Sequence, residues 1–234
     1  MNRTVGHAII SAALVLAAGC AAPDDGANRS SAPATVESPP ATNPTHPPPG
    51  EVVGTSSSSA TLLSSVPRTA DLWDHERLSG VVEGVITIVD DTVGDEMIPT
   101  TRFTVEVERS LGDDIGSTVT VVEIGGYQPV GDVPLAERAK MGLDEDLPSD
   151  AVIDHAPLGG APHPGVGDRV LMFLTTIPTG ETDQYVGLGE AFGRFVPDGS
   201  GGWTRAAWER GYERALSGED VDSRLRDVDT SGRS

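Results

Sequence analysis

The sequence has few of the side chains on which many small folds and functions depend. It has a single cysteine, so an intramolecular disulfide, a zinc ribbon and a C-x-x-C redox motif are all excluded. Only 16 basic residues stand against 36 acidic ones, and a net charge of -20 argues against nucleic acid as a partner, because neutralising phosphates needs a basic surface. Aromatic residues are scarce and all lie between Trp73 and Tyr212. The later part of the chain must therefore supply the core, in one domain of about 160 residues.

The one cysteine follows a short apolar segment near the start of the chain. Arg3 precedes an apolar run over residues 8–18, which is too short to span a bilayer. The segment Leu16-Ala17-Ala18-Gly19-Cys20 resembles the lipobox of a bacterial lipoprotein signal, and that resemblance implies cleavage before Cys20 and its acylation. We therefore expect a signal peptide over residues 1–19 and a lipid on Cys20 that anchors the protein to the outer face of the cell membrane. The alternative is an ordinary secretory peptide with a bystander thiol.

The next segment, residues 20–68, has the composition of a linker. It holds half of the prolines of the chain, a run of four serines at residues 56–59, and no aromatic side chain. Such a segment cannot bury enough apolar surface to offset the entropy of ordering, so we predict a disordered spacer between the membrane and the domain. We predict a second disordered, acidic segment over residues 219–234.

Residues 69–218 show the alternating pattern of β-strands separated by turn residues. Strands are predicted over 79–89, 101–109, 118–124, 169–177, 184–188 and 193–196. Helices are predicted over 69–78, over 134–141 in the long third connection, and over 204–216, where Trp208, Tyr212 and Leu216 follow helical spacing. Gly84 inside the first strand predicts a bulge or bend. Three strands, a helix and further strands predict a mainly β fold with a small OB-like barrel.

Several stretches of this domain resemble a bacterial extracytoplasmic group with an OB or netrin-like barrel. They are Val81–Val85, Phe103–Arg109, Gly125-Gly126, Val166–Leu174 and Gly193–Phe195. The resemblance implies a fold and a place outside the cytoplasm. Netrin-like inhibitors of metalloproteases insert an N-terminal cysteine at the barrel edge, whereas Cys20 lies about fifty residues before the barrel, so we do not carry the inhibitory activity over.

The connection over residues 125–167 carries the best polar constellation. Its members are Asp144, Asp146, Asp150, Asp154, His155 and His163. Carboxylates suit Ca²⁺, and the two histidines suit a transition metal. The spacing matches no standard metal loop, however, and several prolines punctuate it, so we favour a solvated acidic loop without metal or cofactor. Connections of this length are often functional, which makes this loop the first place to look for a ligand.

The sequence thus favours a non-catalytic module of the cell envelope that binds another envelope protein or a glycan. No G-x-S-x-G, H-E-x-x-H, P-loop or dinucleotide motif is present. Two alternatives stay open: a metal-dependent hydrolase that uses the 125–167 loop, and a structural spacer domain. The hydrolase hypothesis requires His155, His163 and carboxylates to lie within about 4 Å of one another.

Overall fold

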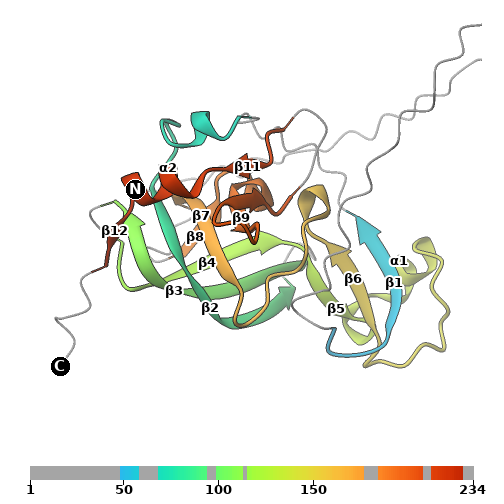
Figure 1. The fold of residues 1–234 in the computed structure, drawn as a ribbon. Helices are drawn as coiled ribbons and strands as arrows, with labels where there is room; N and C mark the ends of the chain where they lie inside the picture. Colours follow the sequence, from blue (N-terminus) through green and yellow to red (C-terminus); the bar gives the residue numbers. More distant parts are fainter. Residues whose placement is uncertain are drawn as a thin grey trace, which may run out of the picture. The chain divides into compact units, whose positions relative to one another are not determined.

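The computed structural model describes six segments of the chain, and together they form a mainly β structure with few helices (Figure 1). They are residues 48–57, 68–93, 99–112, 115–176, 184–207 and 212–228. The predicted signal peptide, Cys20 and most of the predicted linker lie outside the described residues. No helix in the described part of the chain is long and apolar enough to cross a bilayer.

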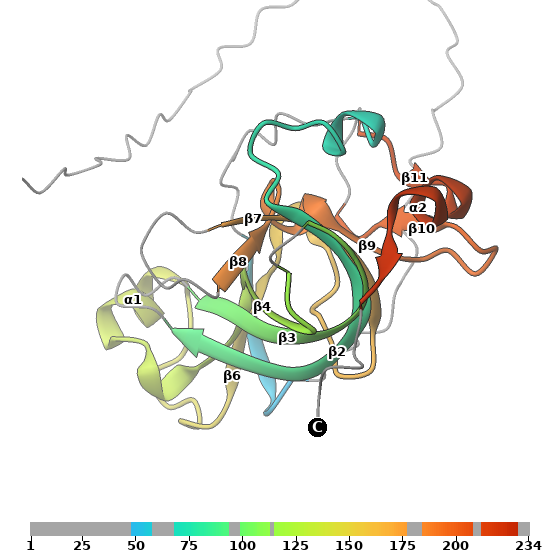
Figure 2. The ribbon, with the colours of Figure 1, turned by 90° about the vertical axis from the view of Figure 1, so that its left-hand side faces the viewer.

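Five strands close into a barrel. The first three, β2 (Gly80–Val93), β3 (Pro99–Leu111) and β4 (Thr118–Ile124), form an antiparallel meander. The other two are β7 (Arg169–Thr176), which pairs with β2, and β8 (Gln184–Gly187), which pairs antiparallel with β7 and parallel with β4. These pairings complete the ring, and Figure 2 shows β2 and β3 curving around it. The predicted OB-like barrel is confirmed.

Side chains of these strands alternate between the barrel interior and its outer face. Phe103, Val105 and Val107 of β3 are buried in the interior core, while Glu106 and Glu108 are exposed, as the alternation predicts. Strand β7 is buried on both faces, because Val170 and Met172 join the interior while Phe173 and Leu171 join a second core outside the barrel.

Gly84 marks a bulge in the pairing of β2 with β3, as predicted. The register shifts between Glu83 and Gly84, so that Glu83 is opposite Arg109 and Gly84 is opposite Val107. A Cβ at position 84 would overlap the carbonyl oxygen of Glu106. Glycine is therefore required by the close approach of the two backbones.

The second core lies between the outer face of β2 and β7 and a layer built mostly from the end of the chain. This layer contains a 3-10 turn (Ala70–Leu72), β9 (Arg194–Pro197), β10 (Trp203–Arg205), β11 (Ala215–Leu216), α2 (Gly218–Arg224) and β12 (Arg226–Asp227). The helix predicted over 204–216 is wrong, since both ends of that range are strand and the last helix begins at Gly218. Trp208 lies outside the described residues. Part of the predicted disordered tail is also ordered, as α2 and β12.

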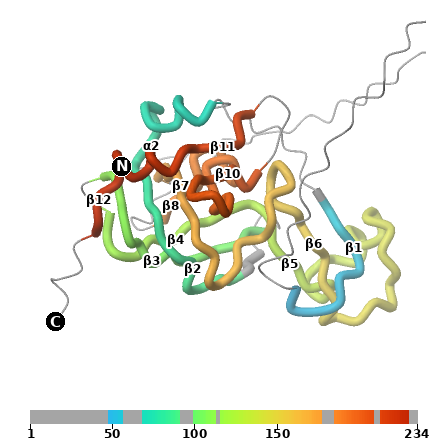
Figure 3. The backbone as a smooth tube through the Cα atoms, in the orientation of Figure 1, coloured from blue at the N-terminus to red at the C-terminus, as the bar shows by residue number. Residues whose placement is uncertain are grey.

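The long third connection is a small lobe rather than an irregular loop. It contains β5 (Gly126–Pro129), a 3-10 turn (Val130–Asp132), the predicted helix as α1 (Leu135–Lys140), β6 (Val152–Ala156) and a second 3-10 turn (Leu158–Gly160). Strand β1 (Val52–Ser57), from the segment predicted as linker, pairs parallel with β6 and gives the strand order β1-β6-β5. Figure 3 shows β1 lying beside β6 although the two are far apart in the sequence. We call residues 52–57 and 126–156 the lobe.

Candidate functional site

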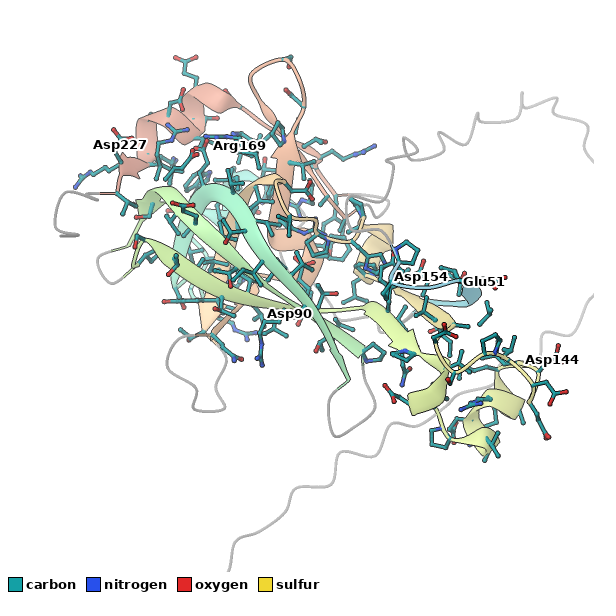
Figure 4. All side chains as sticks on the ribbon, turned by 90° about the horizontal axis from the view of Figure 1, so that it is seen from below. Glu51, Asp90, Asp144, Asp154, Arg169 and Asp227 are labelled. Atoms are coloured by element: carbon teal, nitrogen blue, oxygen red, sulfur yellow. The ribbon has the colours of Figure 1, made fainter. Side chains whose placement is uncertain are left out.

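The six residues of the predicted polar constellation do not converge. Asp144, Asp146 and Asp150 are exposed in the segment between α1 and β6, whereas Asp154 and His155 lie on β6. Figure 4 shows Asp144 and Asp154 well apart. No group of three or more histidine, cysteine or acidic side chains in the described segments is arranged to hold a metal ion.

Asp154 and His163 do meet. The Nε2 atom of His163 lies 2.8 Å from Oδ1 of Asp154, and the His163 side chain is only 6% exposed. Tyr127, the register partner of Asp154 on β5, packs against the imidazole with ring centroids 4.5 Å apart and the rings tilted by 38°. The aromatic ring and the carboxylate together fix the position of His163. The pair joins β6 to the loop that leads back to the barrel.

His155, the neighbour of Asp154 on β6, makes a separate pair with Ser56. The two are register partners across β1 and β6, and Oγ of Ser56 lies 3.0 Å from Nδ1 of His155. Burial lowers the pKa of His155, opposed by the charge of Asp154 and reinforced by His163, so the imidazole is neutral at pH 7. Its Nε2 atom is buried and has no hydrogen-bond partner among the described residues.

These two pairs cannot form one catalytic group. Adjacent residues of a strand point to opposite faces of the sheet, so the side chains of Asp154 and His155 lie on opposite faces of β6. Asp154 therefore orients His163 and leaves the Ser56 and His155 pair without a carboxylate, which a Ser-His-Asp arrangement requires. The observed geometry provides hydrogen bonding without an assembled nucleophile or metal centre.

A cavity of about 380 Å³ lies beside the Ser56 and His155 pair, between β1 and the turn that follows α1. Its walls are formed by Val53, Gly54, Thr55, Ser56, Met141, Gly142, Leu143 and Ile153. Four consecutive residues of β1 belong to this wall, although their side chains alternate between the two faces. The cavity therefore runs along β1, and Ile153 of β6 and the turn after α1 complete its wall. Its volume lies near the lower end of the range for ligand sites.

The sequence drew attention to the connection that supplies part of the cavity wall, but it did not indicate Ser56 or the cavity. Ser56 belongs to the serine run of the predicted linker, where nothing local indicates a strand. The only sequence signal is the short pair Val52-Val53 between proline-rich and serine-rich stretches. A pairing across 99 residues of sequence cannot be inferred from it.

A buried ion pair joins β9 to the end of β4 that leads into the lobe. Nε of Arg194 lies 3.0 Å from Oε1 of Glu123, and both side chains are 1% exposed. Arg194 also donates from Nη2 to the carbonyl oxygen of Pro162 at 2.7 Å, in the loop that carries His163. Because both groups are sealed from solvent, the pair ties the barrel to this loop and offers no surface to a substrate.

Glu190 lies close to this ion pair, at the start of a 3-10 turn (Glu190–Gly193). Burial and, to a smaller extent, the charge of Glu123 raise the pKa of Glu190 to about 7, against the opposing effect of a hydrogen bond from the backbone N–H of Ile124. Glu190 also has a left-handed backbone with φ of 60°, the only described non-glycine residue with positive φ. A strained acid that titrates near neutral pH makes this end of the barrel sensitive to protons.

A second ion network lies on the outer face of the barrel. The carboxylate of Glu83 is 3% exposed and accepts hydrogen bonds from Arg109 and Arg169, and Nη1 of Arg109 lies 2.6 Å from Oδ1 of Asp222 on α2. Arg169 also reaches Glu108 at 2.6 Å. Both guanidinium groups are thus already paired with carboxylates. The network holds α2 against β2, β3 and β7.

The lobe cavity is therefore the candidate ligand site, with Ser56, the partner of His155, in its wall. The chain matches no protein-family model, no curated protein and no solved structure.

Proposed function

We propose that this protein is a lipid-anchored binding module on the outer face of the cell membrane, and that it belongs to the extracytoplasmic group with an OB or netrin-like barrel that it resembles. The anchor is Cys20, the only cysteine of the chain, which follows the apolar run of a signal peptide after Gly19. Two or three acyl chains on this residue give a stable anchor, because each buried CH₂ contributes about 0.8 kcal/mol. The partner is an envelope protein or a glycan.

The single observation that carries the binding role is the lobe. The barrel closes with β2, β3, β4, β7 and β8 alone, so the lobe is not needed to complete the ring. Yet the lobe has its own buried core, formed by Val130, Val133, Ala151 and Ile153, and its own cavity. A connection that is folded around a cavity is better suited to hold a ligand than to link two strands.

Two measurements in intact cells test this proposal. We expect Cys20→Ala to move the protein from the membrane fraction to the soluble extracytoplasmic fraction. We expect a photo-crosslinking amino acid at Thr55, which lines the cavity, to capture a partner that the same probe at Thr118 on β4 does not capture. Unchanged fractionation of the Cys20 variant would remove the anchor, and equal capture at both positions would remove the lobe as the binding site.

A further inference from the structure

The outer edge of β1 is a place where another strand can pair. In the three-stranded sheet of the lobe, β1 is the terminal strand and pairs only with β6 among the described residues. The cavity runs along β1 over Val53–Ser56, beside this strand. An accessible strand edge is a template for pairing with an extended peptide, because its N–H and C=O groups already have the spacing of a β-ladder.

The side chains around this edge are apolar. Met141, which lines the cavity, and Val52, at the start of β1, are each 41% exposed, and Leu135 of α1 is 59% exposed. Leu143 and Val53 are partly buried at the cavity wall. Three of the six exposed large hydrophobic side chains in the described structure thus belong to the lobe. They provide pockets for alternate apolar side chains of a paired strand.

The charges around the edge are negative. Asp144, Glu145 and Asp146 are exposed and directly follow Leu143 of the cavity wall, and Glu51 is exposed immediately before β1. The two cations of α1 are already engaged, since Lys140 lies 2.6 Å from Glu137 and Arg138 donates to the carbonyl oxygen of Val133 at 2.8 Å. A ligand that carries positive charge is therefore favoured over an anionic one.

We propose that β1 binds an extended segment of a partner protein in which basic and apolar side chains alternate, by addition of that segment as a further strand. This inference rests on the proposed binding function and names the chemistry of its partner. The backbone ladder provides affinity, the apolar walls accept one face of the segment, and the acidic residues select the charge of the other face.

Binding of synthetic peptides to the full chain tests the inference. The probe is a fluorescent hexapeptide of alternating lysine and valine, which matches the six residues of β1, followed by fluorescence anisotropy. We expect saturable binding that weakens about tenfold when alternate backbone nitrogens are methylated, because methylation removes ladder hydrogen bonds and keeps the charge. We expect a glutamate and valine peptide to bind at least about tenfold more weakly.

Matched variants of the protein locate the site. Thr55 is exposed and lines the cavity, so Thr55→Trp should occlude the edge and weaken lysine and valine peptide binding about tenfold, whereas Thr118→Trp on an exposed position of β4 should not. Circular dichroism checks that both variants are folded.

Equal binding of the methylated peptide, or equal binding by both variants, would overturn strand addition. If no peptide binds while the Thr55 crosslinker still captures a partner in cells, this inference fails and the proposed function stands. Capture of a glycan at Thr55 would also overturn it.

Discussion

The barrel and the lobe solve the problem of strand edges in opposite ways. In the barrel, β8 pairs with both β4 and β7, so the ring leaves no unpaired edge and its interior is filled by apolar side chains. In the lobe, β1 is the terminal strand of a three-stranded sheet, and the core of the lobe is much smaller and lies beside a cavity. Every barrel strand has two neighbours, whereas β1 has one among the described residues, and the proposed binding role rests on this difference.

The two regions also bury ionisable groups of opposite kind. The barrel end buries Glu190 beside Glu123, which raises the pKa of Glu190 to about 7. The lobe partly buries His155, and this burial lowers the pKa of that imidazole. In both cases burial favours the neutral form, which is the protonated acid for glutamate and the deprotonated base for histidine. The pH dependence of stability therefore has opposite signs in the two regions.

The largest expected effect belongs to the core on the outer face of the barrel. Phe173 is fully buried and packs edge-to-face on Trp73, with ring centroids 4.7 Å apart. Phe173→Ala should lower the free energy of unfolding by about 3 to 5 kcal/mol, because it leaves a cavity among rings that cannot collapse into it. Glu106→Ala, on the exposed face of β3, should change it by at most about 0.5 kcal/mol. Chemical denaturation measures both, and similar midpoints would contradict the assignment of Phe173 to the core.

The barrel strands and α1 could be predicted from the sequence because their signals are local. Alternation of Phe103, Val105 and Val107 identifies a strand and its buried face without knowledge of any other segment. Pro134 and Gly142 likewise delimit α1, and the structure places Gly142 in the left-handed conformation with φ of 72° after the helix ends. The order of these strands and this helix along the chain then predicts the barrel.

The remaining features depend on pairings that local signals do not reveal. Strand β1 exists because β6 is available to pair with it, and helical spacing toward the end of the chain was overridden when Trp203–Arg205 paired with β9. The burial of Glu123 was easier to predict, because this residue continues the inward alternation of Val119 and Val121. A carboxylate at an interior position predicts a buried partner, although not that the partner is Arg194.

The next largest effect should be the pH dependence contributed by Glu190. Its folded pKa of about 7 lies above the usual value of 4.5, so its contribution to stability is fully present below pH 4.5 and is lost as the pH rises through 7. We expect the free energy of unfolding to fall by roughly 2 to 3 kcal/mol across this range. Glu190→Gln should remove this dependence, because the amide still accepts a hydrogen bond from Ile124 but does not titrate.

Urea denaturation from pH 4.5 to pH 8 measures this effect. Glu106→Gln is the matched control, since Glu106 is exposed and lies on the opposite face of its strand from the barrel interior. The groups that act on Glu190 are Glu123, through its charge, and the N–H of Ile124, while Arg194 neutralises Glu123 in part. A pH profile of Glu190→Gln identical to that of the native chain would show that Glu190 does not titrate in this range.

The smallest effect should be local to the lobe and opposite in sign. The folded pKa of His155 lies below the usual value of 6.5, so its contribution to stability is present above pH 6.5 and is lost as the pH falls through the folded value. Protonation would place a charge in a buried position beside β1. We therefore expect the hydrogen-exchange protection of β1 and β6 amides, corrected for intrinsic exchange rates, to decrease below pH 6.5 while that of β3 does not.

Three variants separate this local effect from that of the barrel end. His155→Gln should make the protection of β1 and β6 independent of pH, because the amide replaces the titrating ring. Glu190→Gln should leave the loss of protection in the lobe unchanged. Ser56→Ala should lower protection of β1 at all pH values by about 1 kcal/mol, since it removes one hydrogen bond without removing the titrating group. Equal loss of protection in lobe and barrel on acidification would mean that the two regions open together, and that the lobe does not move as an independent unit.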